Sequence, residues 1–312
     1  MDVLADVLRA ARAQGSWALQ VLHDPPWAVL YRPSPPLMLH AVVRGAGWIA
    51  VDGAEPVRLA EREVAVVRGP VPHKVADALE TPAQLVVEGA ERCTEPAGPG
   101  SGPVRLAPRT YGRDGAASTV VVSGSYPWGG HPGSPLLDAL PPVLHLSADR
   151  TPHALLDAIS HEIPVDEPGQ ETVLDGLLDA LLIRTLRGWF GRSGVVPPAW
   201  FGALDDPVVG PALRRLHERP GESWTVAGLA AAVGVSRAGL ARRFKDRVGR
   251  PPLTYLTNWR MTLAASMLRD PVPSVAEIAH RVGYTDAFAF ATAFKRVLGT
   301  TPSDYRASCL RH

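Results

Sequence analysis

Cysteine is scarce in this sequence of 312 residues, which contains only Cys93 and Cys309. Two cysteines so far apart indicate neither a disulfide framework nor a zinc site built from cysteine ligands. The sequence has no run of about 18 apolar residues, the length that a membrane-spanning helix needs. Its first residues are charged and lack the apolar segment of a signal peptide. We therefore expect a cytoplasmic protein that has no membrane partner.

Net charge is also low, at +1, but it is unevenly distributed. Residues 205–312 hold 16 Lys and Arg against 9 Asp and Glu, a net charge of +7 that leaves −6 for the rest of the chain. A basic third joined to an acidic remainder is typical of proteins in which one part binds a polyanion. The length predicts about two domains.

The basic third of the chain repeats itself. Residues 244–255 match residues 294–305 at an offset of 50, and residues 229–234 match residues 278–283 at an offset of 49. A repeat of this length indicates two copies of one supersecondary unit.

Each copy has the pattern of a helix, a tight turn and a second helix. Gly234 and Gly283 supply the positive φ that ends the first helix of each copy. Small side chains at Ala230 and Ala279 allow the two helices to cross closely, as in a helix-turn-helix. The expected helix caps are Thr225, Ser236 and Asp286, together with a capping box from Ser274 to Glu277. The expected buried faces carry Leu240, Phe244 and Val248 in the first copy, and Phe290, Phe294 and Leu298 in the second.

Residues 253–269 separate the two copies and have the apolar spacing of one continuous helix. Seventeen helical residues span ~25 Å. A rigid spacer of this size suits two recognition helices that lie about one duplex turn, ~34 Å, apart.

Residues 206–306 closely resemble the DNA-binding domain of the AraC/XylS family of bacterial transcription regulators. The most specific part is residues 278–284, followed by Phe290, Phe294, Lys295, Gly299, Pro302, Tyr305 and Arg306. The resemblance implies that two helices of one chain enter successive major grooves on one face of double-stranded DNA. It also implies that the positions of Ala238, Ala241 and Arg242 face the bases.

Arginine is the main candidate for DNA contact in the first copy. It can bind guanine O6 and N7 with two hydrogen bonds, or grip a phosphate. We predict that Arg242 reads a base and that Arg237 and Arg243 contact phosphates.

The second copy departs from the family pattern, which often has Arg where this chain has Thr292. Its outer face shows Ala287, Phe288, Ala289, Ala291 and Thr292. Two interpretations remain open for this face. The apolar side chains contact thymine methyl groups, or the unit only positions the protein through Lys295, Arg296 and backbone amides. Phe288 has the further alternative of packing against a neighbouring domain. Our hypothesis is that sequence specificity depends more on the first copy.

The acidic N-terminal part, up to about residue 150, alternates short β-branched runs with turn signals, which predicts a closed sheet. Residues 40–48 and 64–73 resemble the two cupin motifs of the sensory domain that many AraC-family regulators carry. The predicted fold class is therefore α+β, a cupin-like β-barrel followed by an all-α double helix-turn-helix.

An enzymatic cupin usually has His-x-His and a Glu in its first motif and a His in its second. Here only His40 and His73 match, so we expect no catalytic residue and no cofactor. A metal site would need a third ligand such as His131. Hydrogen-bonded structural histidine is the other interpretation. If the barrel binds a small-molecule effector, then His40, Trp48, His73 and Trp128 are the candidate lining residues.

Residues 171–190 form a predicted helix with an apolar stripe broad enough to pack against the barrel and a partner subunit of a homodimer together. Packing within the chain alone is the other interpretation of this stripe. Residues 191–198 have the composition of a linker. The expected domains are residues 1–165 (regulatory), residues 166–198 (dimerisation helix and linker) and residues 199–312 (DNA-binding).

The sequence therefore predicts a homodimeric, sequence-specific transcription regulator that is not an enzyme. Its cupin-like domain senses a small-molecule signal. The resemblance favours an activator, with RNA polymerase as a further partner. The alternative is a cupin-type metalloenzyme, or a ligand-binding module with a vestigial DNA reader.

Overall fold

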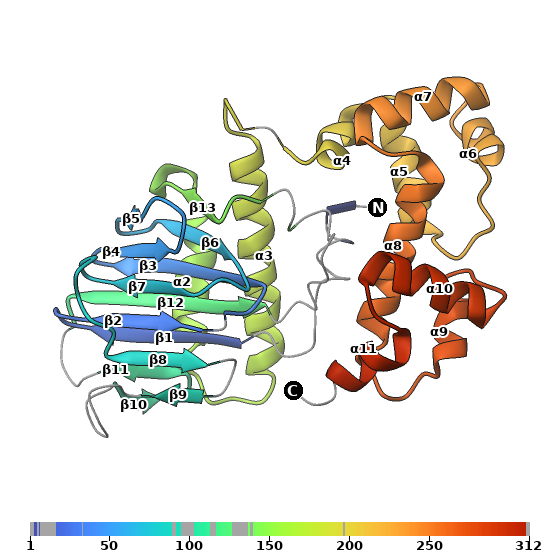
Figure 1. The fold of residues 1–312 in the computed structure, drawn as a ribbon. Helices are drawn as coiled ribbons and strands as arrows, with labels where there is room; N and C mark the ends of the chain where they lie inside the picture. Colours follow the sequence, from blue (N-terminus) through green and yellow to red (C-terminus); the bar gives the residue numbers. More distant parts are fainter. Residues whose placement is uncertain are drawn as a thin grey trace. The chain divides into compact units, whose positions relative to one another are not determined.

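A computed structural model describes residues 3–4, 6, 17–32, 34–88, 92–94, 103–112, 117–126, 137, 140–195 and 197–309 (Figure 1). Contacts divide these residues into two compact units. The sheet unit contains the described residues of 14–128 and 140–195, and the helical unit contains those from 197 onward. By contacts, Val3, Leu4, Asp6 and Leu137 group with the helical unit.

The sheet unit is built from two β-sheets. The larger is seven-stranded, in the order β10-β11-β1-β12-β3-β6-β13, and the smaller is six-stranded, in the order β5-β4-β7-β2-β8-β9. The strands are β1 (Trp17–His23), β2 (Ala28–Tyr31), β3 (Leu37–Arg44), β4 (Gly47–Val51), β5 (Val57–Leu59), β6 (Val64–Arg68), β7 (His73–Ala76), β8 (Leu85–Glu88), β9 (Arg92–Thr94), β10 (Val104–Ala107), β11 (Thr110–Gly112), β12 (Thr119–Tyr126) and β13 (Val143–Leu146).

Strand alternation places one face of each sheet in a shared apolar core. Met38 and Val42 of β3 contribute to it from the larger sheet, and Ile49 and Val75 contribute from the smaller one. The sequence predicted a closed sheet, whereas the described strands form two separate sheets. Two facing sheets bury the same alternating apolar residues without closing every edge, as in double-sheet jelly rolls.

Two helices cover the other face of the larger sheet. These are α2 (His153–Glu162) and α3 (Gln170–Phe190) (Figure 1). Gly124 of β12 has no side chain, so Leu178 of α3 packs directly against the strand, where a Cβ on Gly124 would lie 2.8 Å from Leu178 Cδ2. The Tyr126 hydroxyl donates a hydrogen bond to the Leu178 carbonyl at 2.7 Å. A 3₁₀ turn, η2 (Ala148–Arg150), precedes α2.

The helical unit contains eight α-helices and one 3₁₀ turn within the described residues. They are α4 (Ala199–Gly202), η3 (Ala203–Asp205), α5 (Val209–Glu218), α6 (Val226–Ala232), α7 (Arg237–Val248), α8 (Pro252–Met267), α9 (Val275–Arg281), α10 (Ala287–Leu298) and α11 (Pro302–Cys309). No helix among the described residues of either unit is long and apolar enough to cross a membrane.

Helix α8 connects two small cores. In its first half, Trp259 stacks on His217 of α5 with ring centroids 4.3 Å apart, and the Tyr255 hydroxyl lies 2.8 Å from His217 Nε2. In its second half, Met261 and Ala265 are buried against the helices α9 and α10. The helix ends at Met267, two residues before the predicted end at residue 269. Pro271 follows shortly afterwards and disfavours helical backbone at the residue before it, so the helix does not extend beyond this region.

Candidate functional site

The caps predicted for the two repeats are present. Ser236 accepts a hydrogen bond from Gly239 N at 3.1 Å, and Ser274 and Glu277 form a reciprocal capping box. Asp286 caps α10 by accepting hydrogen bonds from Phe288 N and Ala289 N, both at 3.0 Å. These bonds satisfy amide groups that the start of a helix leaves without a partner, and so they fix where α7 and α10 begin.

The outer face of α7 presents the predicted DNA-contact residues to solvent. Arg237, Ala238 and Arg242 are exposed, while Ala241 is half-buried. Leu240 and Phe244, on the opposite face, are fully buried. Helical periodicity therefore separates a core face from a guanidinium-bearing face, which is the arrangement that a groove-reading helix requires.

Arg243 has a role that its sequence position does not indicate. Its Nε lies 3.0 Å from both carboxylate oxygens of Asp206, and Arg247 Nε lies 3.2 Å from the same group. Asp206 also accepts hydrogen bonds from Val208 N and Val209 N at 3.0 Å, at the start of α5. This buried carboxylate thus joins α7 to α5, and Arg243 acts first as a positioning residue for α7.

The pKa of Asp206 reflects this arrangement. Burial acts to raise the pKa, because a charged carboxylate is poorly solvated there. The backbone N–H groups of Val209 and Val208 and the guanidinium of Arg243 outweigh burial and hold the pKa below its usual value. The carboxylate is therefore ionised at neutral pH, and the contact with Arg243 is an ion pair.

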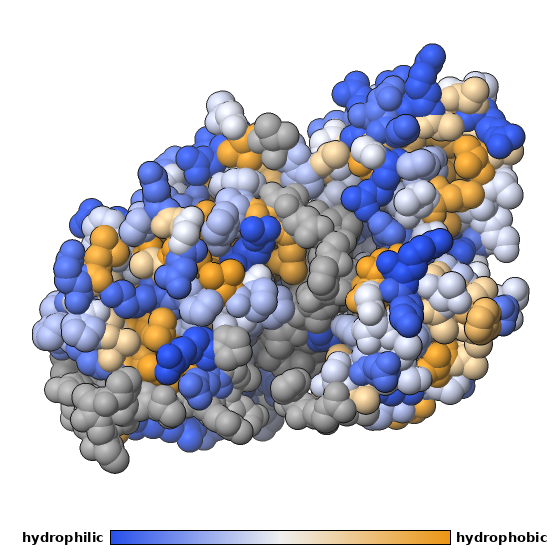
Figure 2. Space-filling view, viewed as in Figure 1, coloured by the Kyte–Doolittle hydropathy of each residue, from blue (hydrophilic) through white to orange (hydrophobic). Residues whose placement is uncertain are grey.

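The outer face of α10 is exposed but has a different character. Phe288 is 80% exposed, and Ala287 and Thr292 are exposed beside it. Lys295 and Arg296 are exposed farther along the helix. Figure 2 shows mostly hydrophilic surface over α7 and visible hydrophobic surface over α9 and α10. Phe288 does not pack into a core among the described residues.

In the sheet unit, His40 and His73 meet across the space between the two sheets. His40 Nε2 lies 2.9 Å from His73 Nε2, and His40 Nδ1 lies 2.9 Å from Ser123 Oγ. Tyr31 stacks on His73 with ring centroids 4.9 Å apart and planes 9° from parallel. All four side chains are buried within an otherwise apolar core.

Burial lowers the pKa of both histidines. The pKa of His40 lies well below its usual value, because of burial first and of the neighbouring His73 second. The pKa of His73 falls to about 4, chiefly because of burial. Both imidazoles are therefore neutral at pH 7, and one N–H of the pair points at the lone pair of the other ring.

The other predicted residues of this core are not brought to the pair. Trp48 is half-buried and lies on the opposite face of its strand from Ile49 and Val51, because side chains alternate along a strand. Its cross-strand neighbour is Ala76, whereas that of Val51 is His73.

Trp128, a predicted lining residue, and His131, a candidate metal ligand, lie outside the residues that the structure describes. Among those described, no third histidine, cysteine or carboxylate joins His40 and His73 in a metal-binding group. A metal site formed by His40, His73 and His131 therefore stays a prediction, of which the structure shows only that His40 and His73 are in contact.

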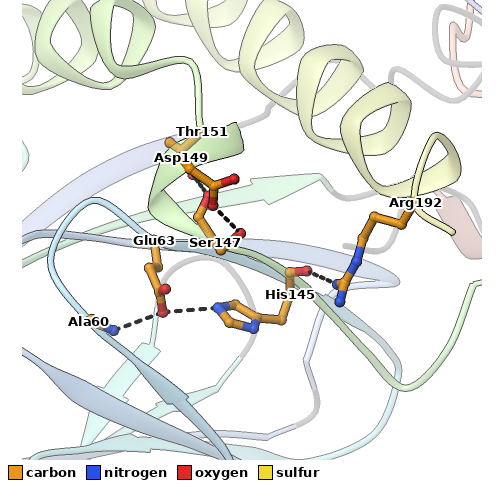
Figure 3. A network of polar contacts seen from close by, with 7 residues as sticks. All are labelled: Ala60, Glu63, His145, Ser147, Asp149, Thr151 and Arg192. Carbon is orange, nitrogen blue, oxygen red and sulfur yellow. Dashed lines mark hydrogen bonds and ion pairs between the residues drawn. The ribbon is translucent and has the colours of Figure 1, made fainter.

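A polar network joins the larger sheet to the end of α3 (Figure 3). His145 Nε2 on β13 lies 2.9 Å from Glu63 Oε2, and the same oxygen accepts a hydrogen bond from Ala60 N at 3.0 Å. Arg192, two residues after α3, donates a hydrogen bond to the His145 carbonyl at 3.0 Å. Its members are far apart in the chain, so no local sequence pattern indicates this network.

Comparison with known proteins agrees with both halves of the architecture. A cupin family model matches residues 2–191, and a model described as a helix-turn-helix domain matches residues 229–308. A protein of Streptomyces antibioticus that carries the name AraC-like transcription regulator is 38% identical over 315 residues, and a protein of the same name from Streptomyces lividans is 36% identical. Each match covers 98% of this chain and 98% of the relative.

Among solved structures, the DNA-binding domain of AdpA in complex with a target DNA is 34% identical. That match covers 33% of this chain and 93% of the AdpA chain, with a TM-score of 0.31.

A double helix-turn-helix joined to a cupin domain defines a DNA-binding regulator of transcription rather than an enzyme. The chain belongs to the AraC-like transcription regulators. The predicted family is confirmed, as are the α+β fold class and the function of a DNA-binding transcription regulator, and the alternative of a cupin metalloenzyme is not favoured.

Proposed function

We propose that the chain reads a specific operator, with Arg242 as its main base contact. The observation that carries this proposal is the exposed guanidinium face of α7 beside a buried core face. Arg242 is exposed, whereas Arg243 is held by Asp206. Of these two, Arg242 therefore is the better placed to bind guanine O6 and N7, and Arg237 to bind phosphate.

Replacement of Arg242 tests this proposal. Arg242→Ala should lose about 1–3 kcal/mol of discrimination at one base pair of a selected operator, because a bidentate contact to guanine is lost. Thr292→Ala should lose less. Arg237→Ala is the matched control, and it should weaken all sequences alike and lower the salt slope by about 1. Equal loss of discrimination in Arg242→Ala and Thr292→Ala contradicts the proposed asymmetry.

We further propose that the core around His40 and His73 senses a small molecule. Support comes from four buried polar side chains gathered in an apolar interior, a common composition of ligand sites. The network from Glu63 through His145 to Arg192 offers a physical route to the linker. A signal has an effect only if it binds the DNA-competent state more tightly than the other state. A compound linked to the regulated genes should change the DNA affinity of the full chain, and an unchanged affinity for every such compound contradicts this role.

We also propose that the protein is a cytoplasmic homodimer and an activator. A cytoplasmic homodimer would use the outer side of α3, where Val173 is 47% exposed. An activator would in addition contact RNA polymerase. Sedimentation of the full chain with operator DNA should give two chains per complex, and a single chain at saturation contradicts the dimer.

A further inference from the structure

The two recognition helices, α7 and α10, have equivalent buried residues but different residues on their outer faces. At the repeat offset of 50, Phe244 corresponds to Phe294, and both are fully buried. The same offset pairs Arg242 with Thr292, and Ala238 with Phe288. Ala238 and Arg242 are two of the positions predicted to face bases. Phe288 therefore occupies a base-facing position of the second helix.

The structure holds Phe288 out in solvent. Asp286 binds the amide N–H groups of Phe288 and Ala289, so the first turn of α10 has a fixed rotation. Phe290, two residues later, is fully buried and sets the inner face of the same turn. Because Phe290 points into the core, Phe288 points away from it and is 80% exposed. An aromatic ring in this position exposes a large apolar surface to water unless something covers it.

The chemistry of the surrounding surface limits what can cover this ring. Ala287, Ala289 and Ala291 offer no side-chain hydrogen bond, and Thr292 is the one residue of 287–292 with a polar side chain. The Asp286 carboxylate is already occupied in capping the helix. Lys295 and Arg296 follow one to two turns later and are exposed, which suits the flanking phosphates. In the major groove, the C5-methyl group of thymine is the apolar group that base edges present.

We propose that Phe288 reads thymine methyl groups, so that the half-site under α10 is specified by apolar contact and the half-site under α7 by arginine. This inference rests on the proposed function, because it assumes that α10 enters the major groove. It predicts an operator with a guanine in one half and one or more thymines in the other, about one duplex turn away.

Deoxyuridine tests the proposal, because it differs from thymidine only by the methyl group and keeps every hydrogen bond. Operator fragments are first selected with the full chain, and each thymine is then replaced singly. Wild-type protein should bind about fourfold more weakly at one or two positions of the α10 half-site, the factor expected for loss of one buried methyl group. Phe288→Ala should bind the thymine operator more weakly and show no difference between thymine and uracil.

Two further variants control for other causes. Arg242→Ala should lose affinity but keep the thymine-to-uracil difference, since it alters the other half-site. Phe288→Leu, which keeps an apolar side chain, should retain part of that difference. Phe288→Ala should melt at the wild-type temperature because the ring is exposed, and this shows that lost binding is not lost folding.

Several outcomes overturn the inference. An equal effect of uracil on wild-type and Phe288→Ala protein means that another residue reads the methyl group, and no effect at any position means that no methyl group is read. Phe288→Ala that binds DNA normally but fails to support transcription with purified RNA polymerase assigns the ring to a protein partner. Failure of the full chain to select any fragment contradicts the proposed operator recognition itself. This result is distinct from the outcomes above, which concern only the role of Phe288.

Discussion

The contact between His40 and His73 makes the sheet unit sensitive to acid. Their rings are joined by an N–H···N hydrogen bond that needs one lone pair, and protonation of both rings places two positive charges 2.9 Å apart in an apolar core. In the unfolded chain each ring takes up a proton near pH 6.5, whereas in the folded chain the pKa of His73 is about 4. The unfolded state therefore binds more protons between these values.

The contribution of these two histidines to the free energy of unfolding should accordingly be present in full above about pH 6.5, and it should decline as the pH falls toward 4. Each such histidine contributes a slope of about 1.4 kcal/mol per pH unit in that interval. Chemical denaturation of the full chain at several pH values measures the slope. His73→Gln, which keeps a hydrogen-bonding partner for His40, should flatten it. His280→Gln, a change of an exposed histidine on α9, is the control, and identical slopes in both variants contradict the account.

Several side-chain contacts could not be predicted from the sequence, because they depend on tertiary structure. The pairing of Arg243 with Asp206 joins positions 37 residues apart, so helix periodicity alone indicates only an exposed arginine. Trp48 lies on the outer side of its strand because Ile49 and Val51 take the inner positions, a parity that depends on which face of β4 meets the other sheet. His40 and His73 were predicted as candidates, but their direct contact depends on how the two sheets face each other.

At the scale of elements, the repeat supplies matched positions for comparison. Gly234 and Gly283 end the first helices of the two copies, with φ of +74° and +85°. A Cβ at Gly234 would meet nothing within 4 Å, whereas one at Gly283 would lie 2.5 Å from the Gly221 carbonyl oxygen. Arg260 Nε donates a hydrogen bond to the Pro220 carbonyl in the same loop at 2.7 Å, so this loop is not free to move away.

Alanine at these two positions should therefore have unequal effects. Gly234→Ala should destabilise the helical unit by about 1–2 kcal/mol, the strain of a side chain in left-handed backbone. Gly283→Ala adds a backbone collision and should cost clearly more. Thermal melting of the two variants checks the order, and equal melting temperatures would argue against the packing of this turn.

Helix boundaries and caps in this unit were largely predictable, because they depend on residues close together in the chain. Ser236, Asp286 and the capping box at Ser274 are all used as the pattern indicates. The polar network at β13 and the division into two sheets were not predictable, since both depend on pairing between distant strands. Interactions between residues close together in the chain can thus be predicted from the sequence, whereas the pairing of distant strands cannot.

At the scale of the whole molecule, charge and architecture agree. The basic third of the chain contains the duplicated helix-turn-helix, and the acidic remainder contains the cupin domain. A positive field around the helix-turn-helix domain draws the protein to DNA without regard to sequence. In our proposal, side chains such as Arg242 then distinguish one site from another. Regulation requires a second state of the chain in which the reading helices are presented differently.

Selection of bound fragments from the host chromosome by the purified full chain tests the central claim most directly. The account predicts strong enrichment of a small set of fragments that share a two-part motif about one duplex turn long, and loss of this enrichment in Arg242→Ala. The genes beside these fragments would identify compounds to test as signals. Recovery of fragments in proportion to their abundance, with wild-type and Arg242→Ala protein alike, would contradict it.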